Sequence, residues 1–159
     1  MILVAGETGF VGKKVVHALR SAELPVRVLA RKPERQDQLR AWGCEIVQGD
    51  LTDPDSLRRA AEGCDTVVHL VAILLGSPEA FERIMVQGTR DLVEAAKGAG
   101  VKRVVLMSAL GTEEGHEVTP YFHSKWEEEQ AVKYSGLEHV IFRPSFVFGE
   151  MQIPIRILA

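Results

Sequence analysis

Short apolar stretches alternate along the chain with segments whose apolar residues recur at helical spacing. The apolar stretches are rich in Val, Ile and Leu without polar alternation, which is typical of strands covered on both faces. Strands are predicted over residues 1–5, 25–30, 45–48, 66–70, 103–107 and 139–143. Helices are predicted over residues 10–20, 36–42, 55–61, 79–99 and 119–135.

This alternation predicts the fold class. Strands separated by helices favour a parallel sheet with right-handed crossovers, an α/β doubly wound, Rossmann-like domain of about six strands in the order 3-2-1-4-5-6. We expect residues 1–149 to form this domain. Residues 150–159 form an apolar tail, interpreted as the start of a truncated or missing C-terminal lobe. We expect the tail to pack against another chain or a C-terminal fragment, because alone it would leave an exposed apolar patch.

Composition narrows the function classes. The 159 residues are 46% hydrophobic and 26% charged, as in one ordinary globular domain. A net charge of -3 gives no attraction to nucleic acid, and no apolar run reaches the roughly 20 residues of a membrane span. Cys44 and Cys64 fit two buried thiols in a reducing compartment, so we expect a cytoplasmic protein. His69, His116 and His123 lack companion ligands, so no metal site is predicted.

A glycine-rich turn follows the first predicted strand and opens the first predicted helix. Such a turn places free helix N–H groups and the positive end of the helix dipole against a phosphate. Gly6 would permit the sharp turn, Gly9 would let a pyrophosphate approach, and Gly12 would let the helix lie close to the strand. The residues predicted to contact a dinucleotide here are Gly6, Thr8, Gly9, Phe10, Val11 and Gly12.

The GxxGxxG spacing of this turn resembles that of short-chain dehydrogenases and reductases. Three further segments resemble that superfamily. They are Gly49-Asp50-Leu51, Val86-Gln87-Gly88-Thr89, and Arg143-Pro144-Ser145 with the following Phe146-Val147-Phe148-Gly149. Residues 69–73, 100–103 and 107–111 are similar to its atypical and extended branch, which includes NmrA-like proteins and a nucleotide-binding accessory subunit of respiratory complex I. Members usually continue past the Arg-Pro-Ser segment into a seventh strand and a substrate lobe.

The resemblance implies additional cofactor contacts beyond the glycine turn. Asp50 would accept a hydrogen bond from the adenine amine, while Lys125 would contact the ribose. The additional contacts that the resemblance implies are Asp50, Leu51, Leu70, Val71, Ala72, Lys125, Pro144 and Ser145.

The end of the second predicted strand bears on the choice of cofactor. An acidic residue there would bind the 2′-hydroxyl of NAD(H), whereas a basic residue would bind the 2′-phosphate of NADP(H). Arg31 and Lys32 occupy this position and no aspartate does, so NADP(H) is favoured. Arg35 can add charge. Glu34 could still reach a ribose hydroxyl, which keeps NAD(H) open.

A Y-x-x-x-K pattern provides candidate catalytic residues. Tyr121 and Lys125 are four residues apart, so they lie on one helical face, where the ammonium could stabilise a phenolate. Ser108 could hold a substrate carbonyl. The resemblance assigns these three residues the roles of acid/base, pKa modifier and carbonyl polariser. Gln87 stands where many relatives have an asparagine that organises a relay water, and the acidic run 127–129 is interpreted as a solvated helix face.

Two functions are compatible with these residues. The first is an NADP(H)-dependent oxidoreductase or epimerase-like enzyme that acts on an unidentified small molecule. The second is a non-catalytic dinucleotide-binding module, such as a redox sensor or an accessory subunit of a respiratory complex. In either case the predicted helices 79–99 and 119–135 could form the face of a homodimer or a larger complex.

Overall fold

A computed structural model describes residues 1–147 and contains the six predicted strands. The strands are β1 (Ile2–Ala5), β2 (Val26–Ala30), β3 (Glu45–Gln48), β4 (Thr66–His69), β5 (Arg103–Met107) and β6 (Glu138–Phe142). Each bound lies within one residue of its predicted position. The sequence pattern therefore located the strands correctly.

All six strands form one parallel sheet in the order β3-β2-β1-β4-β5-β6. The central strand β1 lies between β2 and β4, where Val4 is opposite Val28 on one side and Val68 on the other. The strand order reverses at β1, so the crevice between the carboxyl ends of β1 and β4 is the expected ligand position of a doubly wound fold. The predicted fold class and strand order are confirmed.

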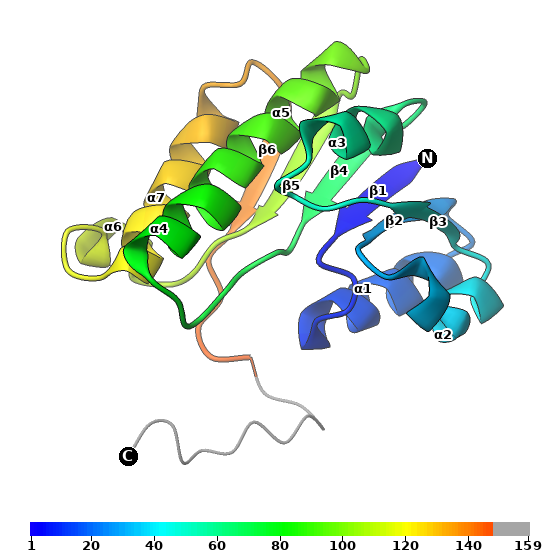
Figure 1. Cartoon of the computed structure of the whole chain (residues 1–159), viewed down its shortest axis with the longest axis horizontal. Coiled ribbons are helices and arrows are strands. Elements are labelled where there is room, and N and C mark those ends of the chain that lie inside the picture. Colours follow the sequence, from blue (N-terminus) through cyan, green and yellow to red (C-terminus); the bar gives the residue numbers. More distant parts are fainter. Residues whose placement is uncertain (148–159) are drawn as a thin grey trace.

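Helices cover both faces of the sheet (Figure 1). The helical segments are α1 (Phe10–Ser21), η1 (Pro33–Arg35), α2 (Asp37–Ala41), α3 (Pro54–Ala61), α4 (Pro78–Phe81), η2 (Glu82–Gln87), α5 (Gly88–Gly98), α6 (Thr112–Gly115) and α7 (Pro120–Lys133). Helices α1 and α2 lie on one face, and α3, α5 and α7 lie on the other. Two hydrophobic cores result, one on each side of the sheet.

Local sequence explains where two of these helices begin. Asp53 caps α3 by accepting hydrogen bonds from the N–H groups of Asp55 and Ser56, and a proline follows it. Thr119 caps α7 in the same way by accepting from the N–H of Phe122. Both caps precede a proline at the first helical position, where the missing N–H has no intrahelical partner to lose.

The predicted helix 79–99 is more complex in the structure. It begins at Pro78 and widens into the π-helical segment η2 before it resumes as α5. The helical periodicity does not reveal this change, because apolar spacing differs little between one α turn and one π turn. The short segments η1 and α6 were also not predicted.

Strand β6 lies at the edge of the sheet, next to β5. Its Val140 and Phe142 side chains are 42% and 58% exposed. The predicted tail, residues 150–159, and the end of the Arg-Pro-Ser segment at residues 148 and 149 lie outside the described residues.

Cys44 and Cys64 are both buried and free, as predicted. Burial raises the pKa of each thiol, which keeps both thiols protonated near neutral pH. Within residues 1–147, none of the helices is long and apolar enough to cross a membrane.

Candidate functional site

The glycine turn between β1 and α1 has the conformation that its sequence predicts. Gly6 adopts a φ of +94°, in the region that favours glycine. A Cβ atom there would lie 2.7 Å from the Leu70 carbonyl carbon and the Val71 nitrogen, at the exit of β4. Gly6 therefore allows the turn and also lets the exits of β1 and β4 approach closely.

Gly9 and Gly12 differ in the space around them. A Cβ atom on Gly12 would lie 2.0 Å from the Gly6 carbonyl oxygen, so α1 can pack against the turn only without a side chain there. Gly9 is the N-cap of α1, with φ -69° and ψ 166°. Its nearest neighbour for a Cβ atom is the Gly6 oxygen at 3.4 Å, an ordinary contact. The protein itself does not require a glycine at position 9, which fits a role in leaving room for a ligand.

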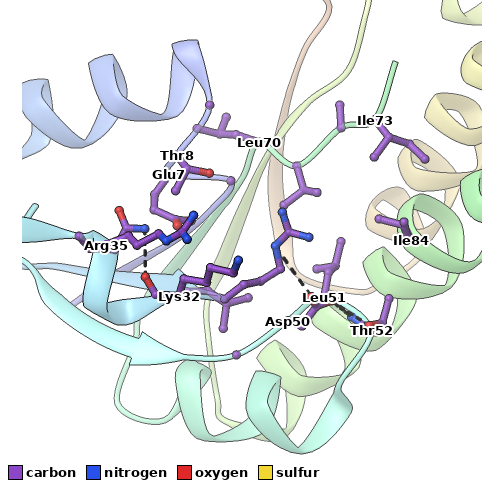
Figure 2. A pocket seen from close by; sticks show the side chains of 18 of the residues that line it. Glu7, Thr8, Lys32, Arg35, Asp50, Leu51, Thr52, Leu70, Ile73 and Ile84 are labelled. Carbon is purple, nitrogen blue, oxygen red and sulfur yellow. Dashed lines mark hydrogen bonds and ion pairs between the residues drawn. The ribbon is translucent and has the colours of Figure 1, made fainter. Parts of the chain in front are cut away.

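A cleft of about 660 Å³ opens above this turn (Figure 2). The exits of β1, β3 and β4 meet there with the loop after β2 and with one face of η2. This is the crevice at the point where the strand order reverses. The cleft is lined by Gly6, Glu7, Thr8, Gly9, Leu29, Arg31, Lys32, Arg35, Gln36, Gly49, Asp50, Leu51, Thr52, Leu70, Val71, Ala72, Ile73, Arg83 and Ile84.

Positive charge gathers on the β2 side of the cleft. Arg31, Lys32 and Arg35 all line it, and the Arg31 side chain is 79% exposed. Next to the loop after β2, at the exit of β3, Asp50 Oδ1 accepts hydrogen bonds from the Thr52 N–H at 2.9 Å and hydroxyl at 2.8 Å. Its Oδ2 lies 4.0 Å from Arg31 Nε. These two bonds orient the carboxylate, while the arginine stays free to meet an anion.

The cleft gathers most of the predicted cofactor contacts. The predicted contacts that line the cleft are Gly6, Thr8, Gly9, Arg31, Lys32, Asp50, Leu51, Leu70, Val71 and Ala72. Phe10, Val11 and Gly12 form the first turn of α1, next to the cleft. Pro144 and Ser145 lie at the exit of β6, where the Pro144 carbonyl accepts a 2.8 Å bond from the Leu110 N–H. These five residues and Lys125 are not among those that line the cleft.

Several residues of the cleft were not predicted from the sequence. Arg83 and Ile84 reach it from η2, far along the chain from the glycine turn. Glu7, the second residue of the turn, is only 3% exposed and is among the residues that line the cleft. The sequence held one signal for these residues, namely the charged Glu7 inside the glycine motif.

The candidate catalytic residue Ser108 lies in a buried polar cluster beside the exit of β5. Its hydroxyl donates a 2.6 Å hydrogen bond to Glu129 Oε1. Glu129 also accepts two bonds from the Arg143 guanidinium and one from Lys133. These partners lower the pKa of Glu129 to about 2, despite the opposing effect of burial. A substrate carbonyl would have to compete with this carboxylate for the Ser108 proton.

The candidate residue Lys125 is also held by a carboxylate. Its side chain is 1% exposed, and its ammonium donates to Glu128 Oε2 at 2.8 Å and to the Met107 carbonyl at 2.9 Å. Burial raises the pKa of Glu128 to about 7. Glu128 Oε1 lies 4.0 Å from His69 Nε2, which shares a 2.8 Å hydrogen bond with Thr89. Lys125 is therefore part of the core beneath the carboxyl ends of β4 and β5.

This cluster corrects the interpretation of the acidic run 127–129. Glu128 and Glu129 are fully buried, and only Glu127 behaves as a helix-face residue, with a 29% exposed side chain paired to Arg90. The prediction of a solvated face was wrong because both carboxylates are paired with cations and turned toward the sheet. Glu128 pairs with the buried Lys125 of its own helix, and Glu129 pairs with Lys133 of that helix and with Arg143 after β6.

The half-buried Tyr121 requires a second correction. Burial raises the pKa of its phenol, and the negative charge of Glu128 adds to the effect. The expected lowering by Lys125 is not found, because the ammonium of that lysine is paired with Glu128. Tyr121 therefore stays protonated at neutral pH and is a weaker acid than an ordinary tyrosine. Gln87 is directed elsewhere, since its amide donates to Asp91 at 2.9 Å.

Within residues 1–147, no group of three or more His, Cys, Asp or Glu side chains is arranged to hold a metal ion. The chemistry that the cleft offers is anion binding at the glycine turn, and Tyr121, Ser108 and Lys125 are not among the residues that line it.

Comparison with known proteins identifies the ligand class. The NAD(P)H-binding family matches residues 6–158. The (4-alkanoyl-5-oxo-2,5-dihydrofuran-3-yl)methyl phosphate reductase of Streptomyces griseus is 40% identical over 144 residues, which cover 91% of this chain and 47% of that protein. Photosystem II assembly factor Ycf39 of Cyanophora paradoxa is 29% identical over 158 residues, 97% of this chain and 49% of the relative. The chain thus spans about half the length of these relatives.

Solved structures agree with this assignment. A short-chain dehydrogenase/reductase superfamily protein from Agrobacterium tumefaciens with bound NAD is 32% identical, with a TM-score of 0.77 over 90% of this chain and 48% of that one. The NADPH-dependent quinone oxidoreductase QOR2 of Escherichia coli, complexed with NADPH, is 25% identical, with a TM-score of 0.73 and the same coverage of both chains. The predicted resemblance to short-chain dehydrogenases and reductases is confirmed. These neighbours include one NAD complex and one NADPH complex, so they leave the cofactor preference open.

Proposed function

The chain belongs to the NAD(P)H-binding family, and on this premise we propose that its cleft binds NADP(H) in preference to NAD(H). The observation that carries the proposal is the position of Arg31, Lys32 and Arg35 on the wall of the cleft next to the glycine turn. The free N–H groups at the start of α1 would hold the pyrophosphate. Arg31 would hold the 2′-phosphate, because its exposed guanidinium forms a fork that matches phosphate oxygens.

Asp50 and Leu51 would contact the adenine ring. The Asp50 carboxylate is oriented by Thr52, and among residues 1–147 no hydrogen bond engages its Oδ2. Leu70, Val71 and Ala72, at the exit of β4, would lie along the path from the pyrophosphate to the nicotinamide. We propose residues 1–149 as the dinucleotide-binding unit.

Calorimetric titration with NADPH and NADH at two salt concentrations tests the preference. We expect tighter binding of NADPH, and an affinity that falls as salt rises because exposed charge pairs are screened. Arg31→Ala should weaken NADPH binding by about tenfold or more, since it removes a charge-assisted contact of roughly 1.5–3 kcal/mol, and should change NADH binding little.

The matched control is Arg103→Ala, which removes the same charge at the amino end of β5, where Arg103 pairs with Glu138. Equal affinities for the two cofactors at low salt would contradict the preference. Equal effects of the two arginine variants would do the same.

We further propose that this unit supports reduction of a small carbonyl compound. NADPH, when bound, would supply a hydride, and Tyr121 would provide the proton for the oxygen of the reduced carbonyl. The phenol is protonated at neutral pH, and proton transfer would require a cation such as Lys125 to lower the pKa that burial raises. Lys125 and Ser108 would act as predicted only if they exchange their present carboxylate partners for cofactor and substrate.

A second candidate, a non-catalytic dinucleotide-binding module, is favoured by one observation. Ser108 and Lys125 both have their polar groups engaged by buried carboxylates. In this case the cluster stabilises the domain and the cofactor serves as a bound signal or structural element. The two candidates differ in whether cofactor affinity depends on Lys125, which the variants in the Discussion measure.

We place this function in the cytoplasm and expect a small-molecule substrate rather than nucleic acid. Helices α5 and α7 pack side by side on one face of the sheet (Figure 1). We propose this pair as the face of a homodimer, in line with the resemblance.

A further inference from the structure

Glu7 is a carboxylate placed inside an anion-binding turn. It follows Gly6 directly and precedes Thr8, so it belongs to the segment whose N–H groups face the cleft. Its side chain is 3% exposed and lines the cleft. Figure 2 shows Glu7 and Thr8 together at the turn, with Arg35 and Lys32 on the neighbouring loop. An ionised carboxylate at this place would repel a bound phosphate.

The charges around Glu7 come from three parts of the chain. Arg31, Lys32 and Arg35 lie on the loop after β2, Asp50 lies at the exit of β3, and Arg83 reaches the cleft from η2. Within the described residues these are the charged groups that line the cleft besides Glu7. Arg31 lowers the pKa of Glu7, as do the adjacent backbone groups of Gly6 and Glu7, but burial outweighs them and the pKa is raised.

Arg31 therefore stands between two acids. Its guanidinium lies 4.0 Å from Asp50, and its charge also acts on Glu7. A phosphate that binds Arg31 shares this cation with both carboxylates. Asp50 is 39% exposed, so water screens its repulsion of a phosphate, whereas the buried Glu7 is screened much less.

We propose that Glu7 is a specificity-determining residue that opposes the 2′-phosphate of NADP(H), so that this cofactor binds with uptake of a proton from solvent by the Glu7 carboxylate. The inference rests on the proposed binding of NADP(H) in the cleft. Glu7 thereby limits the advantage that Arg31, Lys32 and Arg35 give to the phosphorylated cofactor, and it makes this advantage depend on pH.

The direction of the pH dependence follows from linkage. The negative charge of the phosphate raises the pKa of Glu7 further in the complex, so the complex holds the proton more tightly than the free protein does. NADPH affinity therefore gains from a fall in pH through the range in which Glu7 titrates. The phosphate itself has a second pKa near 6, which acts in the opposite direction. A comparison of variants at each pH isolates the contribution of Glu7.

The experiment is fluorescence titration of NADPH and NADH between about pH 5.5 and 8.5. The proteins compared are the wild type, Glu7→Gln and the control Glu62→Gln, which removes an exposed carboxylate outside the cleft. At the upper pH we expect Glu7→Gln to bind NADPH on the order of tenfold more tightly than the wild type. The gain for NADH should be clearly smaller, and the NADPH gain should shrink as pH falls. Glu62→Gln should match the wild type throughout.

Equal gains for NADPH and NADH, or a gain that does not change with pH, would overturn the role of Glu7 while leaving NADP(H) binding intact. Failure of the wild type to bind either cofactor would instead overturn the proposed function and this inference with it. Calorimetry of the wild type in buffers of different ionisation enthalpy gives a test without any variant. Proton uptake should be larger with NADPH than with NADH at the same pH, and equal uptake would contradict the proposal.

Discussion

Gly9→Val should abolish dinucleotide binding in a chain that still folds. The extended φ and ψ of Gly9 suit a branched residue, and a Cβ atom there meets only the Gly6 oxygen at 3.4 Å. The remaining valine carbons would occupy the space of the pyrophosphate above the turn. We expect the affinity for NADPH to fall by more than about 100-fold, the loss of roughly 3 kcal/mol of binding free energy.

Gly12→Ala is the matched contrast, because its single added carbon would lie 2.0 Å from the Gly6 backbone oxygen. This variant should lose folding as well as binding. Circular dichroism and thermal unfolding report on folding, and NADPH titration reports on binding. Normal NADPH binding by folded Gly9→Val would show that the pyrophosphate does not lie over this turn.

Glu128→Leu should lower the free energy of unfolding by about 3–5 kcal/mol, since it leaves the Lys125 ammonium buried without its charged partner. Lys125 is 1% exposed, and its one other hydrogen-bond acceptor in the described structure is the Met107 carbonyl. Lys125→Met should cost less, because a Glu128 carboxyl with a pKa of about 7 can bind a proton and become neutral. The double variant Glu128→Leu with Lys125→Met should recover most of the lost stability.

Urea unfolding of the two single variants and the double variant gives their coupling energy. Glu127→Leu is the control on the same helix, and loss of its exposed pair with Arg90 should cost about 1 kcal/mol or less. Additive effects of Glu128→Leu and Lys125→Met would contradict a buried pair.

NADPH affinity in the double variant then separates the two candidate functions. Wild-type affinity would favour the binding module, and a marked loss would favour a reductase in which Lys125 contacts the ribose.

The fold was predictable because its signals are local in the sequence. Strands such as β1 and β5 are short runs of aliphatic residues, and the glycine spacing of the first turn follows directly from β1. The structure shows why the roles of Gly6 and Gly12 could be predicted from the sequence. A positive φ at Gly6 and a backbone clash at Gly12 each exclude a side chain. The basic wall of the cleft was also predictable, because Arg31 and Lys32 directly follow the second predicted strand.

The burial of the polar cluster beside β5 was not predictable. Its ion pairs within α7 are local in the sequence, but its place in the core depends on contacts with distant segments. Glu129 on α7 is buried by virtue of Arg143, which follows β6, and of Ser108, which follows β5. Glu128 needs His69 and Lys125 around it, from β4 and α7. A run of three glutamates on a helix has the same pattern whether it faces water or the core, so only the tertiary structure distinguishes the two.

The direct test of the central claim is an NMR titration of the ¹⁵N-labelled chain with NADPH. We expect shifts of the backbone amide signals along the cleft, at Gly6 to Gly9, Arg31 and Lys32, Asp50 and Leu51, and Leu70 to Ala72. A second groove lies between α4 and the start of α7, and its lining includes Pro78, His116 and His123. The chemical shifts of the backbone amides in this groove should not change. Unshifted glycine-turn amides at saturating NADPH, or shifts confined to that second groove, would contradict the central claim.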